Sequence, residues 1–423
     1  MTTYAELIAN PDLPRAWLVA AEPYDPAASA LTQVGFSSGL TFPVLDGRFW
    51  PARLGSVLNT QIDLFSQGVS GGSQPGFGEI PVAIGEDAYH SLTRLHWDGR
   101  KIAVLMGPPD GPFSEFQPVF NGTAKAIRYS GGVLSIVLRD FGHRLDKPLQ
   151  ADLFGGTGGL DGSADVKGRP IPLAFGQCVN VPALLIDPVK WVFRVHERAL
   201  QAITAVFDRS LPLVSAGDVA DVWAWTPVAG QYVTSLANGV FRLGAPADGP
   251  VTCDLRGDAE GGYVETAVDV LERIATWKGG LLSADLDAAA LAAADALRPW
   301  PVGLYAADEM RAYAALDQLV QSIGGWWTWT PTGLLTAGIV GIDPPTLTLT
   351  ADDYSDLSLE DDPPPVWRRK VGYRRSWLVQ TLEEQDRPVA RDTEFVGGVP
   401  AQDVADAGAQ IGGGPTTPPG APG

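Results

Sequence analysis

Glycine and proline divide this chain into many short segments. Its 423 residues include 49 Gly and 35 Pro, about a fifth of the total, whereas average proteins contain about an eighth. There is no Gly-X-Y period, and 45% of the residues are apolar, so neither a collagen-like nor a disordered chain is indicated. We therefore expect short strands that are joined by tight turns.

The first predicted hairpin is centred on Asp98-Gly99. This pair lies between the apolar-patterned runs 91–97 and 100–106, which we interpret as two strands. An Asp-Gly pair in this position is typical of a type I′ turn, because that turn requires positive φ angles.

The second predicted hairpin joins strands at 124–129 and 133–138 through Ser130-Gly131-Gly132. The strand at 133–138 is almost continuously apolar. This pattern favours a central strand that is covered on both faces.

The remaining pattern predicts an α+β protein that is mainly β, with several barrel-like or sandwich-like modules and a small helical insert. Apolar residues at helical spacing appear only after residue 260. Helices are predicted at 263–277, 286–297 and 309–323. Strands are predicted at 191–195, 202–207, 231–234, 240–243, 251–255, 326–330, 334–340, 346–350, 367–373 and 377–382.

Composition shifts along the chain suggest six parts. The predicted parts are a β-rich N-terminal domain (1–145), a Gly-rich extended connector (146–172), a second β module (173–260), a helical segment with a strand pair (261–345), a closing β segment (346–400) and a Gly/Pro-rich tail or linker (401–423).

Charge and cysteine content exclude several function classes. The formal net charge of -19 argues against duplex DNA or RNA as a ligand, because lysine and arginine supply most of that affinity. Cys178 and Cys253 are too few for a disulfide framework or a four-thiolate metal site. Residues 1–20 do not resemble a signal peptide, and no run of about 18 apolar residues predicts a membrane-spanning segment.

No complete catalytic motif is present. Gly68-Val69-Ser70-Gly71-Gly72 matches the nucleophile elbow by letter, but loop residues follow where a helix is required. The histidines do not form a metal-binding or catalytic cluster, and a surface or capping role is favoured for His143. The four are His90, His96, His143 and His196.

The Gly-rich run at 155–159 resembles a phosphate-binding loop only superficially. The Gly-Lys-Ser/Thr end of that motif is missing, so a flexible connector is the favoured interpretation. Asp161, Ser163 and Asp165 alternate like the first ligands of a calcium loop, but the glycine and glutamate that complete the loop are absent. We predict no catalytic residue, no cofactor and no metal ligand.

The chain has 13 tryptophans, with clusters at Trp223/Trp225 and at Trp326, Trp327 and Trp329. Exposed tryptophans can stack on sugar rings or bases. Alternating tryptophans on a strand also share one face and fill a core. We favour the core for both clusters.

Several segments of the chain form a recognisable series: 145–150, 154–162, 167–176, 180–187, 202–209 and 367–377. The most specific of them contains Lys167-Gly168-Arg169-Pro170-x-Pro172-x-x-Phe175-Gly176. Together these segments resemble the central tail hub, or baseplate hub, proteins of long-tailed phages with non-contractile tails (siphophages). The resemblance covers about 90–400.

The resemblance implies a virion structural protein at the tail tip, made in the host cytoplasm. Such hubs form homotrimers, with two tube-like β domains per chain in a pseudo-sixfold ring. Their partners are the distal tail protein, the tape-measure protein, and the tip and fibre proteins, and DNA passes through the ring during ejection. Some relatives hold an iron–sulfur cluster through several cysteines. This chain has only Cys178 and Cys253, so we expect no such cluster here. An acidic lumen would repel DNA phosphates and let them slide.

One alternative is a carbohydrate-binding receptor-recognition module or a cell-wall glycan hydrolase, since the chain is acidic and rich in tryptophan. Burial of the tryptophan clusters would argue against stacking on glycans. Two carboxylates facing each other in a cleft would favour the hydrolase. A cytosolic metabolic enzyme is disfavoured, because no nucleotide, metal or nucleophile motif is complete.

Overall fold

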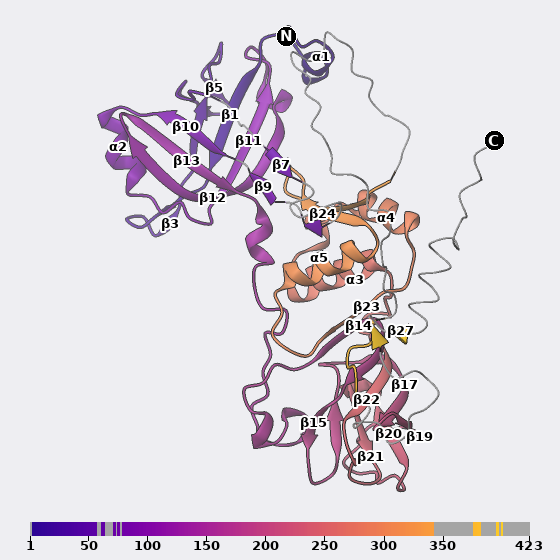
Figure 1. Ribbon diagram of the computed structural model, residues 1–423. Helices are drawn as coiled ribbons and strands as arrows, with labels where there is room; N and C mark the ends of the chain where they lie inside the picture. The colour runs from indigo at the N-terminus through magenta and orange to yellow at the C-terminus, as the bar shows by residue number, and fades with distance from the viewer. Residues whose placement is uncertain are drawn as a thin grey trace, which may run out of the picture. The chain divides into compact units, whose positions relative to one another are not determined.

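The computed structural model describes residues 2–56, 61–63, 71–72, 74–76, 78–341, 375–381, 395–396 and 399–400 (Figure 1). The chain forms two compact units, each made of separate stretches of sequence. The first contains 1–149, 271–298 and 311–339, and the second contains 150–270, 299–310 and the described residues after 339. The predicted strands at 346–350 and 367–373, Ser70 and the tail at 401–423 lie outside the described residues.

A six-stranded antiparallel sheet forms the body of the first unit. The side chains on one face of this sheet, among them Ile102, Phe120 and Ile136, form a core with almost no exposure. In spatial order the strands are β10 (Glu79–Ala83), β13 (Val133–Arg139), β12 (Gln117–Ser130), β11 (Lys101–Gly107), β1 (Ala16–Ala21) and β4 (Val34–Ser37).

The predicted hairpin at 130–133 is confirmed. Ser130 pairs with Val133, and both intervening glycines have positive φ, +56° at Gly131 and +81° at Gly132. Strand β13 lies inside the sheet, but its burial alternates, with Leu134 in the core and Val133 exposed. The prediction that both faces are covered is therefore wrong.

The predicted strand at 91–97 is wrong. Helix α2 (Glu86–Thr93) occupies its first three residues, no strand forms over the rest, and Leu92 and Leu95 pack into the core of the sheet. The Asp98-Gly99 turn exists, since the Arg100 N–H donates to the Trp97 carbonyl at 2.9 Å. Only Gly99 has positive φ, so the turn is not type I′.

The first unit also contains the later helices and a tryptophan-rich hairpin. Helix α5 (Ala312–Ser322) contacts β24 (Gly325–Trp329), and the Trp327 indole donates to Asp317 at 2.6 Å. Trp327 and Trp329 are buried, as predicted. Strand β24 pairs with β25 (Leu335–Ile339) and with β8 (Gly71–Gly72).

Two other predicted helices are present, and a short N-terminal helix, like α2, was not expected. The N-terminal helix α1 (Tyr4–Ala9) begins at a capping box. Helix α3 (Ala267–Arg273) continues into a π-helical turn (Ile274–Lys278), and α4 (Ala288–Leu297) matches its prediction closely.

The described residues also form four small strand pairs. These are β2 (Tyr24–Asp25) with β3 (Ala30–Leu31), β5 (Val44–Leu45) with β6 (Arg48–Phe49), β7 (Gln61–Asp63) with β9 (Gln74–Gly76), and β26 (Phe395–Val396) with β27 (Val399–Pro400).

The second unit is a sandwich of two five-stranded sheets. Its shared core takes side chains from both sheets, including Val206 and Cys253 from one and Phe241 from the other. The first sheet has the order β18 (Leu211–Pro212), β17 (Leu200–Asp208), β22 (Val251–Asp258), β14 (Leu173–Pro182) and β23 (Gly303–Ala306). The second has the order β15 (Leu184–Asp187), β16 (Val192–Arg194), β21 (Val240–Leu243), β20 (Gln231–Ser235) and β19 (Val214–Asp218).

All five strands predicted between 191 and 255 are present, so the α+β, mainly β fold class is confirmed. The predicted strand at 377–382 is wrong for its described part. Residues 375–381 make a single β-bridge, between Ser376 and Val179, and the Asn180 side chain donates to Ser376 Oγ at 3.0 Å.

The Gly-rich segment is folded, and the expectation of an extended, flexible connector is wrong for it. Phe154 and Val166 pack with Val192 and Val233 on the second sheet, on the face opposite the sandwich core. The Asp161 carboxylate accepts hydrogen bonds from the Gly155 N–H, the Thr157 N–H and the Thr157 hydroxyl. These bonds close a compact loop, 155–161, that contains three glycines with positive φ.

Candidate functional site

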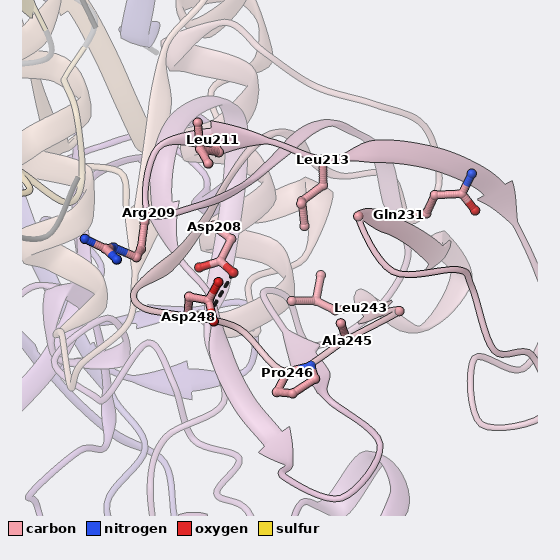
Figure 2. A pocket seen from close by; sticks show the side chains of 11 residues that line it. Asp208, Arg209, Leu211, Leu213, Gln231, Leu243, Ala245, Pro246 and Asp248 are labelled. Atoms are coloured by element: carbon pink, nitrogen blue, oxygen red, sulfur yellow. Dashed lines mark hydrogen bonds between the residues drawn. The ribbon is translucent and has the colours of Figure 1, made fainter. Parts of the chain in front are cut away.

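A pocket of about 200 Å³ opens in the second unit where the two sheets end (Figure 2). Its apolar wall includes Leu211, Leu213, Leu243 and Pro246, and its polar side carries Asp208 and Asp248. Leu213 links β18 of the first sheet to β19 of the second, and Leu243 is the last residue of β21. The pocket therefore forms where the chain crosses between sheets.

The turn beside the pocket has an unusual backbone. Asp208 pairs with Leu211, and the two residues between them have positive φ, +47° at Arg209 and +67° at Ser210. Such φ angles suit glycine or asparagine, and each costs about 1–3 kcal/mol for other residues unless the surroundings hold them. The Arg209 N–H donates to the Pro250 carbonyl at 3.2 Å, and the Ser210 hydroxyl donates to Gln380.

The acidic side of the pocket is fixed by backbone hydrogen bonds. One oxygen of Asp208 accepts from the Asp248 N–H at 2.9 Å, and the other accepts from the Gly249 N–H at 3.1 Å. These two donors hold the Asp208 carboxylate in one orientation. The Arg209 side chain points away from Asp208 and Asp248 in Figure 2. The pocket thus combines an apolar wall with two carboxylates.

Sequence reasoning missed this pocket. Asp208 and Asp248 meet because β17 pairs with β22, which places Asp208 opposite Val251. No local motif marks that pairing. The only local signal is the Asp-Arg-Ser turn between two apolar runs, which lacks the glycine that would identify it.

A second cluster in this unit is formed by two buried residues, His196 and Asp258, whose polar atoms have partners within the protein. The Ala174 N–H donates to Nδ1 of His196 at 3.0 Å, so Nε2 carries the proton and donates to Asp258 at 3.3 Å. Arg198 donates to both oxygens of Asp258, at 2.5 and 2.9 Å. Neither His196 nor Asp258 is exposed, so this cluster stabilises the fold.

Burial acts on the two groups with different results. It lowers the pKa of His196 despite the hydrogen bond to Asp258. Burial raises the pKa of Asp258, but the bonds from His196 and Arg198 outweigh that effect and lower the pKa to about 2. The pair is therefore a neutral imidazole beside a charged carboxylate.

The other candidate residues have structural surroundings. His143 shares a hydrogen bond with the Asp140 carbonyl at the start of a 3₁₀ turn. Cys178 and Cys253 are buried free thiols, and burial raises the pKa of Cys178 to about 12. In the part of the chain that the structure describes, no group of three or more His, Cys, Asp or Glu side chains could hold a metal ion.

The first tryptophan cluster is not a core pair. Trp223 is half-buried and donates to Asp187 at 3.0 Å, but Trp225 is 50% exposed, so the core prediction is wrong for Trp225. The buried Arg242 donates to the carbonyls of Val222, Trp223 and Trp225, at 3.2, 3.4 and 2.8 Å. The loop presents the Trp225 ring to solvent from a fixed backbone.

No protein-family model matches the chain, and no curated protein matches it. Among solved structures, a chain from the virion of a native gene transfer agent particle is similar to this one. The two share 15% identity with a TM-score of 0.25, and the match covers 60% of this chain and 84% of that chain. Within the described ranges, no helix has the length and apolar character needed to cross a membrane.

Proposed function

We propose that this chain is a virion structural protein, the central tail hub at the distal end of the tail of a phage or phage-like particle. It joins the tail tube to tip and fibre proteins and forms part of a ring through which DNA passes. The proposal rests on the sequence resemblance between about 90 and 400 and on the part that its most specific segment plays in the fold.

The observation that carries the proposal is the architectural use of residues 167–176. Gly168 has a φ of +78° and donates its N–H to the Phe154 carbonyl at 2.8 Å. Phe175 is fully buried, and Gly176 has a φ of +62° at a point where an added Cβ would collide with the Val302 carbonyl. These constraints concern backbone path and packing, which suits an assembly protein.

The open edges of the sandwich also support an assembly role. Every residue of β19 is exposed, and Val214 on this strand is 63% exposed. Edge strands offer unpaired backbone groups to another chain. We expect the trimer contacts, or those with the distal tail, tape-measure, tip and fibre proteins, to use such edges.

In this proposal the protein is made in the host cytoplasm, acts at the tail tip and carries no catalytic role or cofactor. The test is the mass in solution, measured by size exclusion with light scattering, alone and with the distal tail protein from the same particle. We expect a species of three times the 44.7 kDa chain, or a complex with the partner. A chain that stays monomeric even with the partner present would contradict the proposal.

A second candidate is glycan recognition, which the exposure of Trp225 favours. We expect retardation of the protein in gels that contain host cell-wall polysaccharide, and loss of retardation in Trp225→Ala. Trp300→Ala is the matched control, since Trp300 is 56% exposed. Equal retardation of both variants would contradict this candidate.

A glycan hydrolase is less well supported, although Asp208 and Asp248 share one side of the pocket. Such an enzyme needs two carboxylates that flank the scissile bond. Both oxygens of Asp208 instead accept backbone N–H bonds from Asp248 and Gly249, so this carboxylate is engaged in holding the turn.

A further inference from the structure

We infer that the pocket beside Asp208 binds a lysine or arginine side chain from an extended segment of a partner protein. The inference uses only the geometry of the second unit, so it does not depend on the tail-hub proposal.

The size of the pocket favours a single side chain. Its volume of about 200 Å³ is smaller than the roughly 300–1,000 Å³ of typical small-molecule sites. The wall of Leu213, Leu243 and Pro246 offers an apolar surface that an aliphatic stem can cover. Lysine and arginine have such a stem below a charged group.

The charge of the pocket selects a cation. Asp208 and Asp248 lie on the same side of the pocket, and Figure 2 shows the Arg209 guanidinium directed away from them. The hydrogen bonds from the Asp248 and Gly249 N–H groups hold the Asp208 carboxylate in one orientation, so little further ordering is needed when a cation binds. A carboxylate has about four acceptor positions, so Asp208 keeps acceptor capacity for an incoming ammonium or guanidinium group.

The strained turn fits a binding role. Arg209 and Ser210 hold positive φ angles that a glycine would adopt more easily. This backbone places the Asp208 side chain at the pocket and directs the Arg209 side chain away from Asp208 and Asp248. Non-glycine residues in such conformations concentrate at binding and active sites.

An extended partner has a place to pair. The exposed strand β19 begins at Val214, whose N–H donates to the carbonyl of Gly230, a residue of the pocket lining. Addition of a strand to an exposed edge, with a side chain in an adjacent pocket, is an established mode of peptide recognition. The surplus of acid in the chain also favours a basic partner over a polyanion.

The experiment uses the full chain and three capped pentapeptides that differ at the central residue: Val-Thr-Lys-Val-Thr, its norleucine analogue and its glutamate analogue. Binding is read from the methyl resonances of Leu213 and Leu243 in labelled protein. We expect the lysine peptide to shift both resonances, more strongly at low salt. The norleucine peptide, which has the stem without the charge, should bind about tenfold more weakly.

Two matched variants locate the charge. Asp248→Lys should abolish binding of the lysine peptide, and Asp165→Asn, which removes an exposed acid elsewhere in this unit, should leave it unchanged. Asp248 is exposed, so its replacement should keep the fold, which a thermal melt checks. Equal binding of the glutamate peptide, or unchanged binding to Asp248→Lys, would overturn the inference. The inference would also be overturned if none of the three peptides shifted the methyl resonances of Leu213 and Leu243. That result is expected if the chain's own residues after 381 fill the pocket.

Discussion

Nε2 of His196 lies 3.3 Å from Oδ1 of Asp258, and neither side chain is exposed to solvent. The two residues are 62 positions apart in the sequence: His196 lies in the loop after β16, and Asp258 is the last residue of β22. We therefore expect both low pH and substitution of either residue to lower the free energy of unfolding.

Stability should fall as the pH drops below about 6.5. The pKa of His196 is lowered by burial from 6.5, so the unfolded chain binds the proton more readily than the folded chain in this range. A second loss should follow between 3.8 and about 2, as the Asp258 carboxylate is protonated. Urea unfolding at a series of pH values measures both steps. The upper step should be absent in His196→Asn, and its persistence there would exclude His196 as the cause.

Asp258→Asn should lower the free energy of unfolding by about 3–5 kcal/mol, because it leaves the Arg198 charge without its carboxylate in a buried cluster. Asp165→Asn, at an exposed position, should change it by less than about 0.5 kcal/mol. Chemical denaturation of the two variants gives the comparison. Similar values for both would show that the cluster adds little to stability.

Phe154→Ala should cost about 3–5 kcal/mol, since the ring is buried against the second sheet. The guanidinium of Arg194 also lies 5.6 Å from the centre of this ring. The neighbouring Leu153 is 55% exposed, so Leu153→Ala is the control and should be nearly neutral. Hydrogen exchange should accelerate across 155–167 only in the Phe154 variant.

The turn at Arg209 should respond to substitution in opposite directions. Arg209→Asn should stabilise the protein by up to about 1 kcal/mol, because asparagine tolerates positive φ. Arg209→Val should destabilise it by more than about 1 kcal/mol, because a β-branched residue does not. Thermal melts of the two variants test this, and a shift of both in the same direction would contradict the role assigned to φ.

The two thiols should be unreactive in the folded protein. Cys178 and Cys253 are buried, and burial raises the pKa of Cys178 to about 12, so almost no thiolate forms near neutral pH. A thiol reagent should modify both residues only at the rate of unfolding, and in denaturant it should modify them at once. Rapid labelling of the native chain would indicate that the sandwich opens locally.

The sequence predicted those elements whose signals are local. Strands β20 and β21 were expected within one residue of their ends, because apolar runs are bounded there by turn residues. Helix α2 was missed because Leu92, near its end, and Leu95, just after it, belong to an apolar-patterned run that also fits a strand, and packing against the sheet decides between the two. The hairpin at Ser130 was found because two adjacent glycines specify its turn.

Long-range contacts determine what the sequence did not reveal. The Gly-rich segment looked flexible, but the Arg194 guanidinium donates to the Leu160 carbonyl at 2.7 Å and helps hold the segment against the second sheet. The pocket likewise needs Asp208 and Asp248, which are joined by strand pairing across 40 residues. The exposure of Trp225 depends on the buried Arg242, which no spacing rule connects to it.

The division of the first unit into three stretches of sequence affects the order in which the protein can fold during synthesis. Both sheets of the second unit are complete once Ala306 has been made, whereas β25 of the first unit ends at Ile339. The ribosome therefore supplies the last strand of the sandwich before the last strand of the first unit. We expect the first unit to remain incomplete on the nascent chain until its last helix and hairpin have been made. A polypeptide stalled between Ala306 and Ile339 would then contain a folded sandwich and an incomplete first unit.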